Sequence, residues 1–175
     1  CPIADAPVPT SRLAVSTLDA GHIAPSPMAF SLAPVLTLLA EQIEPEATKR
    51  GLTLRVVPTR AEVISDPVLL ERMLRNLLHN ALRYTPKGKI LLGCRRRGDR
   101  VVICVADTGI GIPEDKFATI FEDFSRLGIK GQGADRGLGL GLAVVRRMAE
   151  LLDHGVTVRS RLGHGSCFAV VVHRV

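Results

Sequence analysis

The sequence has few aromatic residues and no apolar run long enough to cross a bilayer. Phe, Tyr and Trp together make up 3% of the 175 residues, with no Trp and a single Tyr. Proteins that hold single-stranded nucleic acid stack bases on aromatic side chains, so this shortage disfavours that class. A membrane-spanning helix needs about 20 consecutive apolar residues, which the chain does not contain. The composition therefore predicts a soluble globular protein.

Closely spaced cysteines and a secretory signal are also missing. The four cysteines, at positions 1, 94, 104 and 167, are scattered, and none forms a CxxC pair. Zinc and thiol-redox sites usually need such pairs, so we expect reduced, mostly buried thiols. Residues 1–30 lack the basic start and continuous apolar stretch of a secretory signal. We interpret the region as a linker.

Basic residues outnumber acidic ones by 23 to 17, which gives a net charge of +6 and a pI near 9.6. Such a surface attracts polyanions or an acidic protein. Nucleic acid is one candidate, but the arginines are dispersed among the predicted elements. A nucleotide or an acidic protein explains the charge as well, so no nucleic acid partner is expected.

The hydrophobic pattern predicts one domain that mixes helices and strands, since 175 residues allow one core but not two. One helix is expected at 31–49, with Gly51 as its C-terminal cap and Pro45 kinking or shortening it. A second helix is expected from the N-cap Asp66 to about Tyr84. A short helix is expected at 114–121 and a long one at 138–153. Strands are expected at 52–57, 89–96, 100–106, 155–161 and 166–173. Residues 122–136 are too polar to bury, and we interpret them as a mobile lid.

Two asparagines lie four residues apart on the helix that follows Asp66. Asn76 and Asn80 therefore project from one face, and Arg83 and Tyr84 follow one turn later. A carboxamide oxygen is a neutral, hard ligand suited to Mg²⁺, so Asn80 could hold such an ion. Asparagines on helices are more often caps or surface residues, however, so this pair alone predicts no site.

The segment DTGIGIP at 107–113 follows a predicted strand. Its glycines let the backbone approach a ligand or adopt positive φ. Asp107 can accept a hydrogen bond from an exocyclic amine such as that of adenine. A structural turn explains the same pattern equally well.

The segment GLGLGL at 137–142 comes directly before the last predicted helix. Free backbone amides and the helix dipole favour phosphate at such a position. It is not a Walker loop, since no Lys-Ser or Lys-Thr follows, and not a Rossmann fingerprint, since it follows the lid rather than a strand. A glycine hinge for the lid is the alternative, and the two interpretations are compatible.

Taken in order, four segments resemble the N, G1, F and G2 boxes of the ATP-binding catalytic domain of sensor histidine kinases. They are residues 76–80, 107–111, FEDF at 121–124, and 137–141. The resemblance covers about residues 30–175. It implies an α+β fold of the Bergerat type, a two-layer sandwich in which a mixed sheet packs against helices and a flexible lid covers ATP. Residues 1–29 would then be a linker and the tail of the preceding dimerisation and phosphoacceptor helix.

The resemblance also implies roles for individual residues. Asn80 would bind Mg²⁺ and Asp107 would read the adenine amine. Arg83 stands where the family usually has a lysine near the phosphates, and Asn76 and Arg83 are the expected catalytic residues. The expected ATP contacts are Asn80, Tyr84, Asp107, Gly109, Gly111, Ile112, Phe124, Arg126, Lys130, Gly137, Leu138, Gly139, Leu140, Gly141 and Leu142.

One position separates branches of this fold. DNA gyrase, mismatch-repair ATPases and serine kinases of the anti-sigma type carry a glutamate four residues before the magnesium asparagine. This chain has Asn76 there, and an amide cannot act as a general base. ATP hydrolysis and serine phosphorylation are thereby disfavoured relative to phosphotransfer to a histidine. An ATP-sensing or protein-interaction module without phosphotransfer is the alternative.

No acceptor-histidine motif is visible in the sequence. Residues 11–25 resemble only the tail of the acceptor hairpin, and His22 is interpreted as a linker histidine. The expected cofactors are ATP and Mg²⁺. The expected partners are the dimerisation and phosphoacceptor helices of the same kinase and the receiver domain of a response regulator. The full-length protein is expected to be a homodimer, and this domain to be cytoplasmic whether or not the whole protein is anchored in a membrane.

Overall fold

The computed structural model describes residues 6–7, 24–117, 119–121 and 141–175. In this part of the chain an eight-stranded sheet packs against three α-helices. The helices are α1 (Leu32–Lys49), α2 (Pro67–Tyr84) and α3 (Gly141–Leu152), with a 3₁₀ turn, η1, at Glu114–Lys116. The strands are β1 (Ala6–Pro7), β2 (Met28–Ser31), β3 (Leu52–Val56), β4 (Glu62–Ser65), β5 (Gly88–Arg97), β6 (Arg100–Asp107), β7 (Gly155–Arg161) and β8 (Gly165–Arg174).

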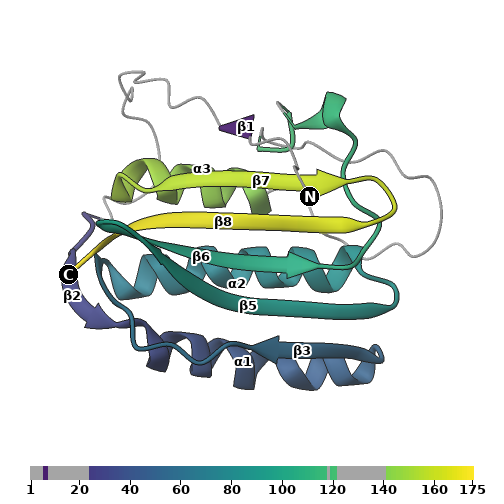
Figure 1. The fold of residues 1–175 in the computed structure, drawn as a ribbon, viewed down its shortest axis with the longest axis horizontal. Helices are drawn as coiled ribbons and strands as arrows, with labels where there is room; N and C mark the ends of the chain where they lie inside the picture. Colours follow the sequence, from purple (N-terminus) through teal and green to yellow (C-terminus); the bar gives the residue numbers. More distant parts are fainter. Residues whose placement is uncertain (1–5, 8–23, 118, 122–140) are drawn as a thin grey trace.

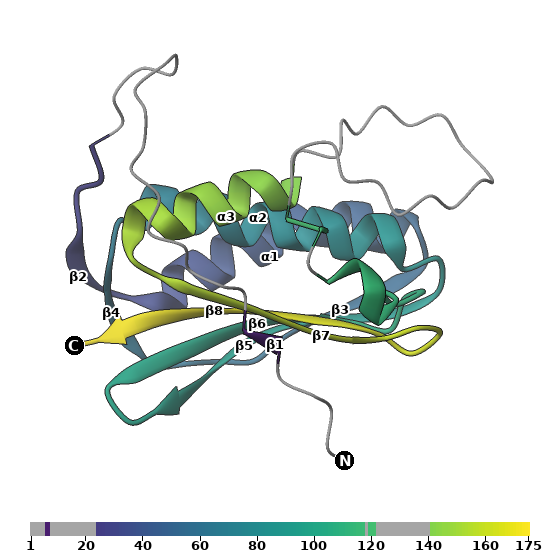
Figure 2. The same cartoon turned by 90° about the horizontal axis from the view of Figure 1, so that it is seen from above.

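The sheet is mixed, and the helices lie along one of its faces. The strand order is β1-β7-β8-β6-β5-β3, and β4 pairs with both β8 and β2. β3 and β5 are parallel, whereas the other pairs are antiparallel. Figure 2 shows α1, α2 and α3 on the same side of the strands, and Figure 1 shows them side by side. The predicted two-layer arrangement of a mixed sheet against helices is confirmed.

Helix α2 lies between α1 and α3 and contributes most to the core. Its apolar residues recur every three or four positions, which places them on a face that contacts the sheet and both neighbouring helices. Truncating one such fully buried leucine to alanine typically costs about 2–5 kcal/mol. The buried residues of α2 are Leu69, Leu70, Met73, Leu74, Leu77, Leu78, Ala81 and Leu82.

Asp66 begins α2, as the sequence predicted. Its Oδ1 accepts hydrogen bonds from the amides of Val68 (2.9 Å) and Leu69 (3.0 Å), and its Oδ2 accepts one from the amide of Ser26 (2.9 Å). Burial of the carboxylate raises its pKa, but these three amide hydrogen bonds outweigh burial, and the pKa of Asp66 lies below its ordinary value. One side chain thus caps the helix and holds the incoming chain at Ser26.

Replacing Asp66 with alanine is expected to lower the free energy of unfolding by about 1 kcal/mol at pH 7, because an N-cap is lost. Since the pKa of Asp66 is lowered in the folded state, its stabilisation is present above the ordinary aspartate pKa and is lost as the pH falls through the lowered value. Urea denaturation at neutral and acid pH measures both effects. The exposed hairpin residue Asp99 supplies the control Asp99→Ala. Equal stability of the two variants at pH 7 would contradict the capping role.

Three local features differ from the sequence predictions. Pro45 does not shorten α1, which continues to Lys49 with Ile43 and Ala47 on either side of the proline buried in the core, and the alternative of a kink stays a prediction. The expected helix at 114–121 is only the 3₁₀ turn η1, since its first hydrogen bonds join residues three apart. Strands β2 and β4 were not predicted, because four residues are too few for a pattern and each depends on a distant partner.

The expected boundary between linker and domain, at residues 29 and 30, falls inside β2. The division itself stays a prediction. The expected lid at 122–136 lies outside the described residues. Among the described residues, no helix is both long and apolar enough to span a membrane.

Candidate functional site

The two asparagines of α2 and the first residue of α3 lie together. A Cβ atom placed on Gly141 would be 3.4 Å from the Oδ1 of Asn80 and 3.9 Å from the Oδ1 of Asn76. Gly141 is the last glycine of the GLGLGL segment and the first residue of a helix of 12 residues with no acidic side chain in its first turn. The amide-bearing end of α3 therefore meets the asparagine face of α2, where a phosphate and its metal ion could be held together.

The donor atoms at this point suit Mg²⁺. The Nδ2 of Asn76 donates to the carbonyl of Arg72 at 2.9 Å, which leaves its Oδ1 turned toward Gly141. Within the described part of the chain, the carboxamide of Asn80 has no hydrogen-bond partner, so its oxygen is available as a ligand. Mg²⁺ commonly takes one or two protein oxygens and completes its shell with phosphates and water. The described residues contain no cluster of three or more His, Cys, Asp or Glu side chains that would compete for a metal.

Asp107 lies at the end of β6 on the face of the sheet that carries the helices. Its Oδ1 accepts hydrogen bonds from the amides of Gly109 (2.8 Å) and Ser166 (3.3 Å). Burial raises the pKa of the carboxyl above its ordinary value, although these two amides and the nearby Thr85 hydroxyl oppose the shift. With Oδ1 occupied by the protein, Oδ2 is the atom left to accept a hydrogen bond from a ligand amine.

Thr85 was not identified from the sequence. Its side chain is only 2% exposed, and its Oγ1 is close enough to Asp107 to influence that carboxyl but makes no hydrogen bond of regular geometry among the described residues. Thr85 and Asp107 both approach Gly109: a Cβ atom there would be 2.9 Å from each of their oxygens. A buried hydroxyl without a partner is costly unless a ligand or a water satisfies it. Its position directly after Tyr84 was the only available signal.

The glycines of the DTGIGIP segment are required by contacts within the protein. A Cβ atom at Gly109 would be 2.2 Å from the carbonyl oxygen of Tyr84, and one at Gly111, where φ is +70°, would be 2.1 Å from that of Arg161. The loop is further held by the amide of Ile112, which donates to Ser160 Oγ at 2.8 Å. A structural turn therefore accounts for both glycines, and a ligand is not needed to explain them.

The remaining predicted site residues that are described are Arg83, Tyr84, Ile112 and Leu142. Tyr84 is half-buried, and the guanidinium carbon of Arg83 lies 5.8 Å from its ring centroid. Ile112 is 6% exposed and belongs to the hydrophobic core, and Leu142 is partly buried against that core. These two residues contribute to the packing of the core. Their contacts with ATP stay predictions.

Part of the predicted site lies outside the described residues, including residues 122–124 of its F box and most of its glycine-rich box, whereas Phe121 is described and is buried against Phe168. The residues concerned are Phe124, Arg126, Lys130, Gly137, Leu138, Gly139 and Leu140.

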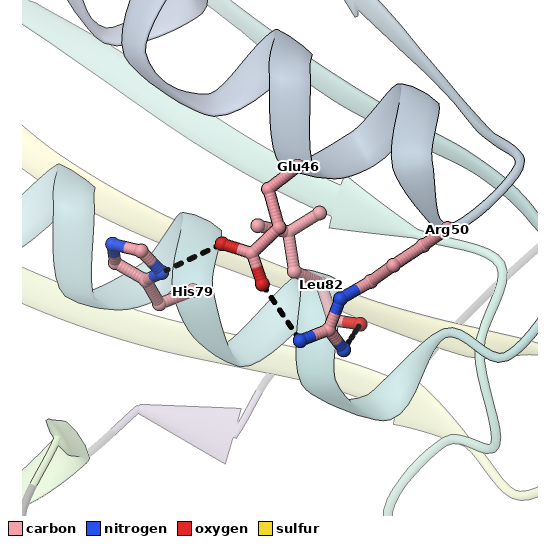
Figure 3. Close-up of polar contacts among 4 residues, drawn as sticks. All are labelled: Glu46, Arg50, His79 and Leu82. Carbon is pink, nitrogen blue, oxygen red and sulfur yellow. Dashed lines mark hydrogen bonds and ion pairs between the residues drawn. The ribbon is translucent and has the colours of Figure 1, made fainter.

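A polar cluster joins α1 to the side of α2 away from Gly141. Glu46 of α1 contacts both Arg50 and His79. Its Oε1 lies 2.6 Å from the guanidinium of Arg50, and its Oε2 lies 4.0 Å from His79 Nδ1. Arg50 also donates to the carbonyl of Leu82 at 3.4 Å. Figure 3 shows His79 directed at this cluster. The neighbouring residues His79 and Asn80 thus serve different faces of one helix.

Comparison with known proteins gives consistent matches. The sequence model described as histidine kinase-, DNA gyrase B-, and HSP90-like ATPase matches residues 65–175. The circadian input-output histidine kinase CikA of Synechococcus elongatus is 35% identical over 163 residues, which are 90% of this chain and 22% of that protein. The sensor histidine kinase RcsC of Escherichia coli is 39% identical over 105 residues, 60% of this chain and 11% of that protein. The chain thus spans less than a quarter of the length of these relatives.

Solved structures show the same fold. The full-length ShkA structure in complex with AMPPNP superposes with a TM-score of 0.75 and 29% identity, covering 90% of this chain and 33% of that one. The catalytic domain of the histidine kinase ThkA, in a nucleotide-free form, superposes with a TM-score of 0.71 and 22% identity, covering 85% of this chain and 96% of that one. The Bergerat-type fold implied by the four boxes is confirmed.

Proposed function

We propose a function that starts from the family to which the chain belongs, the histidine kinase-, DNA gyrase B- and HSP90-like ATPases. The chain binds Mg·ATP and donates the γ-phosphate to a histidine on a separate dimerisation domain of a sensor histidine kinase. Its curated relatives CikA and RcsC are histidine kinases, and the ShkA structure contains an ATP analogue. The receiver domain of a response regulator would be the downstream partner, and the whole protein would act as a homodimer.

The observation that carries the proposal is the contact between Gly141 and the asparagine pair. It joins the two segments whose residue types suit a phosphate and its metal ion, although they are far apart in the sequence. Asn76 stands beside Asn80 at the position from which a general base would act in hydrolytic members of the fold. An amide there cannot take a proton from water or a hydroxyl, which favours transfer to a nucleophile that arrives activated from elsewhere.

The proposed roles of the residues are positioning and charge neutralisation. Asp107 orients the adenine through its free carboxylate oxygen, and the α3 amides beginning at Gly141 bind phosphate oxygens. Asn80 would hold Mg²⁺, which neutralises charge on the phosphates when it is bound. Little covalent chemistry remains for the protein, because phosphoryl transfer depends mainly on alignment of the donor with its acceptor.

Two histidines of this domain are engaged in structural contacts instead. His79 faces Glu46, and the 6%-exposed His154 lies with its Nε2 2.7 Å from the hydroxyl of Ser65. Burial lowers the pKa of His154, so the ring is held in its neutral form. These contacts agree with an acceptor histidine outside the domain.

The proposal predicts that nucleotide binding and phosphotransfer can be separated. This chain alone should bind ATP and label itself negligibly when given ATP labelled at the γ-phosphate, because the proposed acceptor histidine lies on a separate domain. When the dimerisation and phosphoacceptor helices are supplied, upstream in the same chain or in trans, label should appear on a histidine there. Phosphohistidine is labile in acid and stable in base, so the two treatments identify it.

Acid-stable labelling of this chain alone, or rapid ATP turnover by it, would place it in another branch of the fold. Saturable, magnesium-dependent ATP binding without any transfer to its own phosphoacceptor helices would instead support an ATP-sensing module.

A further inference from the structure

Two cysteines lie on the face of the sheet opposite the helices. Ile103 and Val105 of β6 are buried beneath the helices, so Cys104 between them faces outward. Cys104 is opposite Ala169, and Cys167 is opposite Ala106 on the same pair of strands. The two cysteines are therefore diagonal neighbours on the outer face, at a separation that side chains can bridge.

The neighbours of the pair are small. Gly93 of β5 is opposite Cys104 on the side away from β8, and the space beside this glycine is taken by Val57, whose Cβ would lie 3.0 Å from a Cβ placed on Gly93. All three cysteines in the described part of the chain, Cys94 included, are free thiols of intermediate burial. Cys94 lies on the other face of the sheet, where it packs against the core, and its thiol donates a hydrogen bond to Thr59 Oγ1 at 3.0 Å.

Arginines flank the pair from both neighbouring strands. Arg159 of β7 is directly opposite Cys167. Arg95 of β5 lies two residues after Gly93 on the same face of the sheet, so it is a diagonal neighbour of Cys104. No outward-facing position of β5, β6, β7 or β8 carries an acidic side chain. A thiolate on this face thus has positively charged side chains beside it and no carboxylate among the described outward-facing residues of these four strands.

The two thiols titrate as a unit. A hydrogen bond from the Cys167 thiol lowers the pKa of Cys104 to about 7, with burial opposing and the two arginines assisting. The same hydrogen bond, with burial, raises the pKa of Cys167. The pair therefore loses its first proton easily and holds its second tightly, as expected for two acids that share a proton.

We propose that Cys104 and Cys167 form a thiolate modification site that takes small anionic disulfides of the oxidised-glutathione class. The thiolate attacks one sulfur of the disulfide: a protein–reagent S–S bond forms, the reagent S–S bond breaks, and the leaving thiolate carries away the electron pair. The reagent supplies the oxidising equivalents, so no further oxidant is needed. The arginines favour an anionic reagent over a neutral one of similar reactivity.

The test compares two disulfide probes on the folded chain carrying Cys1→Ser. The probes are the anionic 5,5′-dithiobis(2-nitrobenzoate) and the neutral 2,2′-dipyridyl disulfide at pH 7, with acid quenching and peptide mass mapping of each cysteine. One member of the pair should react about tenfold or more faster than Cys94 with the anionic probe. Cys167→Ala should slow the reaction at Cys104, because it removes the thiol that donates a hydrogen bond to the Cys104 thiolate.

Charge is tested separately from folding. Arg95→Gln should lower the anionic-to-neutral rate ratio at the pair severalfold, whereas Arg97→Gln, two positions further along β5, should change it less. Matching thermal unfolding curves establish that both variants are folded. Reaction at the pair no faster than at Cys94, or a rate ratio that Arg95→Gln leaves unchanged, would overturn the proposal. The readout is independent of ATP binding, so the proposed kinase function can fail or hold without affecting it.

Discussion

Replacing Asn80 with alanine is expected to weaken Mg·ATP binding at least about tenfold, by analogy with the cost of disturbing metal ligation in other sites. Metal-free nucleotide should be affected far less, because the proposed role gives the carboxamide oxygen to the metal ion. The contact of Gly141 with Asn80 makes this residue the described side chain best placed for that role. Calorimetric titration of ATP with Mg²⁺ and with a chelator measures the two losses.

The adjacent residue supplies the matched control. His79 lies one position earlier on α2, is 55% exposed at its side chain and faces Glu46 rather than Gly141. His79→Ala should therefore leave both titrations near their starting values. Equal losses with and without Mg²⁺ in Asn80→Ala would rule out a metal ligand and indicate a direct contact with the nucleotide or a packing role.

Replacing Asp107 is expected to remove the preference for adenine over guanine nucleotides. Removing one partner of a hydrogen bond in a partly buried site costs about 1–3 kcal/mol, so Asp107→Ala should lower ATP affinity by that amount and bring it close to that of GTP. Asp107→Asn is the sharper variant. It can keep an oxygen to accept from the amides of Gly109 and Ser166, while the other atom becomes a donor that opposes the adenine amine.

Competition between ATP and GTP measures this preference directly. Asp115→Ala, an exposed carboxylate just after the loop, is the control and should retain the preference. If Asp107→Asn binds ATP over GTP as strongly as the unchanged chain, Asp107 does not read the base. Its hydrogen bonds to Gly109 and Ser166 would then be its whole function.

Thr85 shows where local patterns stop being informative. In the sequence it is an ordinary residue after a helix, and only its place directly after Tyr84 marks it. Only packing shows a buried hydroxyl beside Asp107 and Gly109 with no hydrogen bond of regular geometry among the described residues. The same holds for Cys104 and Cys167, which are far apart in the chain and become neighbours only through the register of β6 and β8.

Local chemistry, by contrast, was predicted correctly where it depends on a few adjacent residues. Asp66 followed by proline predicted a capped helix, and Gly51 predicted the end of α1, where its φ of +70° suits glycine. The hairpins around residues 98–99 and 162–164 followed from turn residues between alternating strands. Each of these choices is settled by backbone sterics and hydrogen bonds within one turn.

The sequence alone therefore determined the class of fold, the order of its main helices and strands, and the residue types of the proposed site. The tertiary structure decided which of those residues meet. Gly141 reaches Asn80 because α3 packs against α2, and the glycines of the 107–113 loop are required by the carbonyls of Tyr84 and Arg161. Helix caps and turns depend on short-range sterics, whereas these contacts depend on burying apolar surface between elements distant in the chain, and local sequence does not encode that geometry.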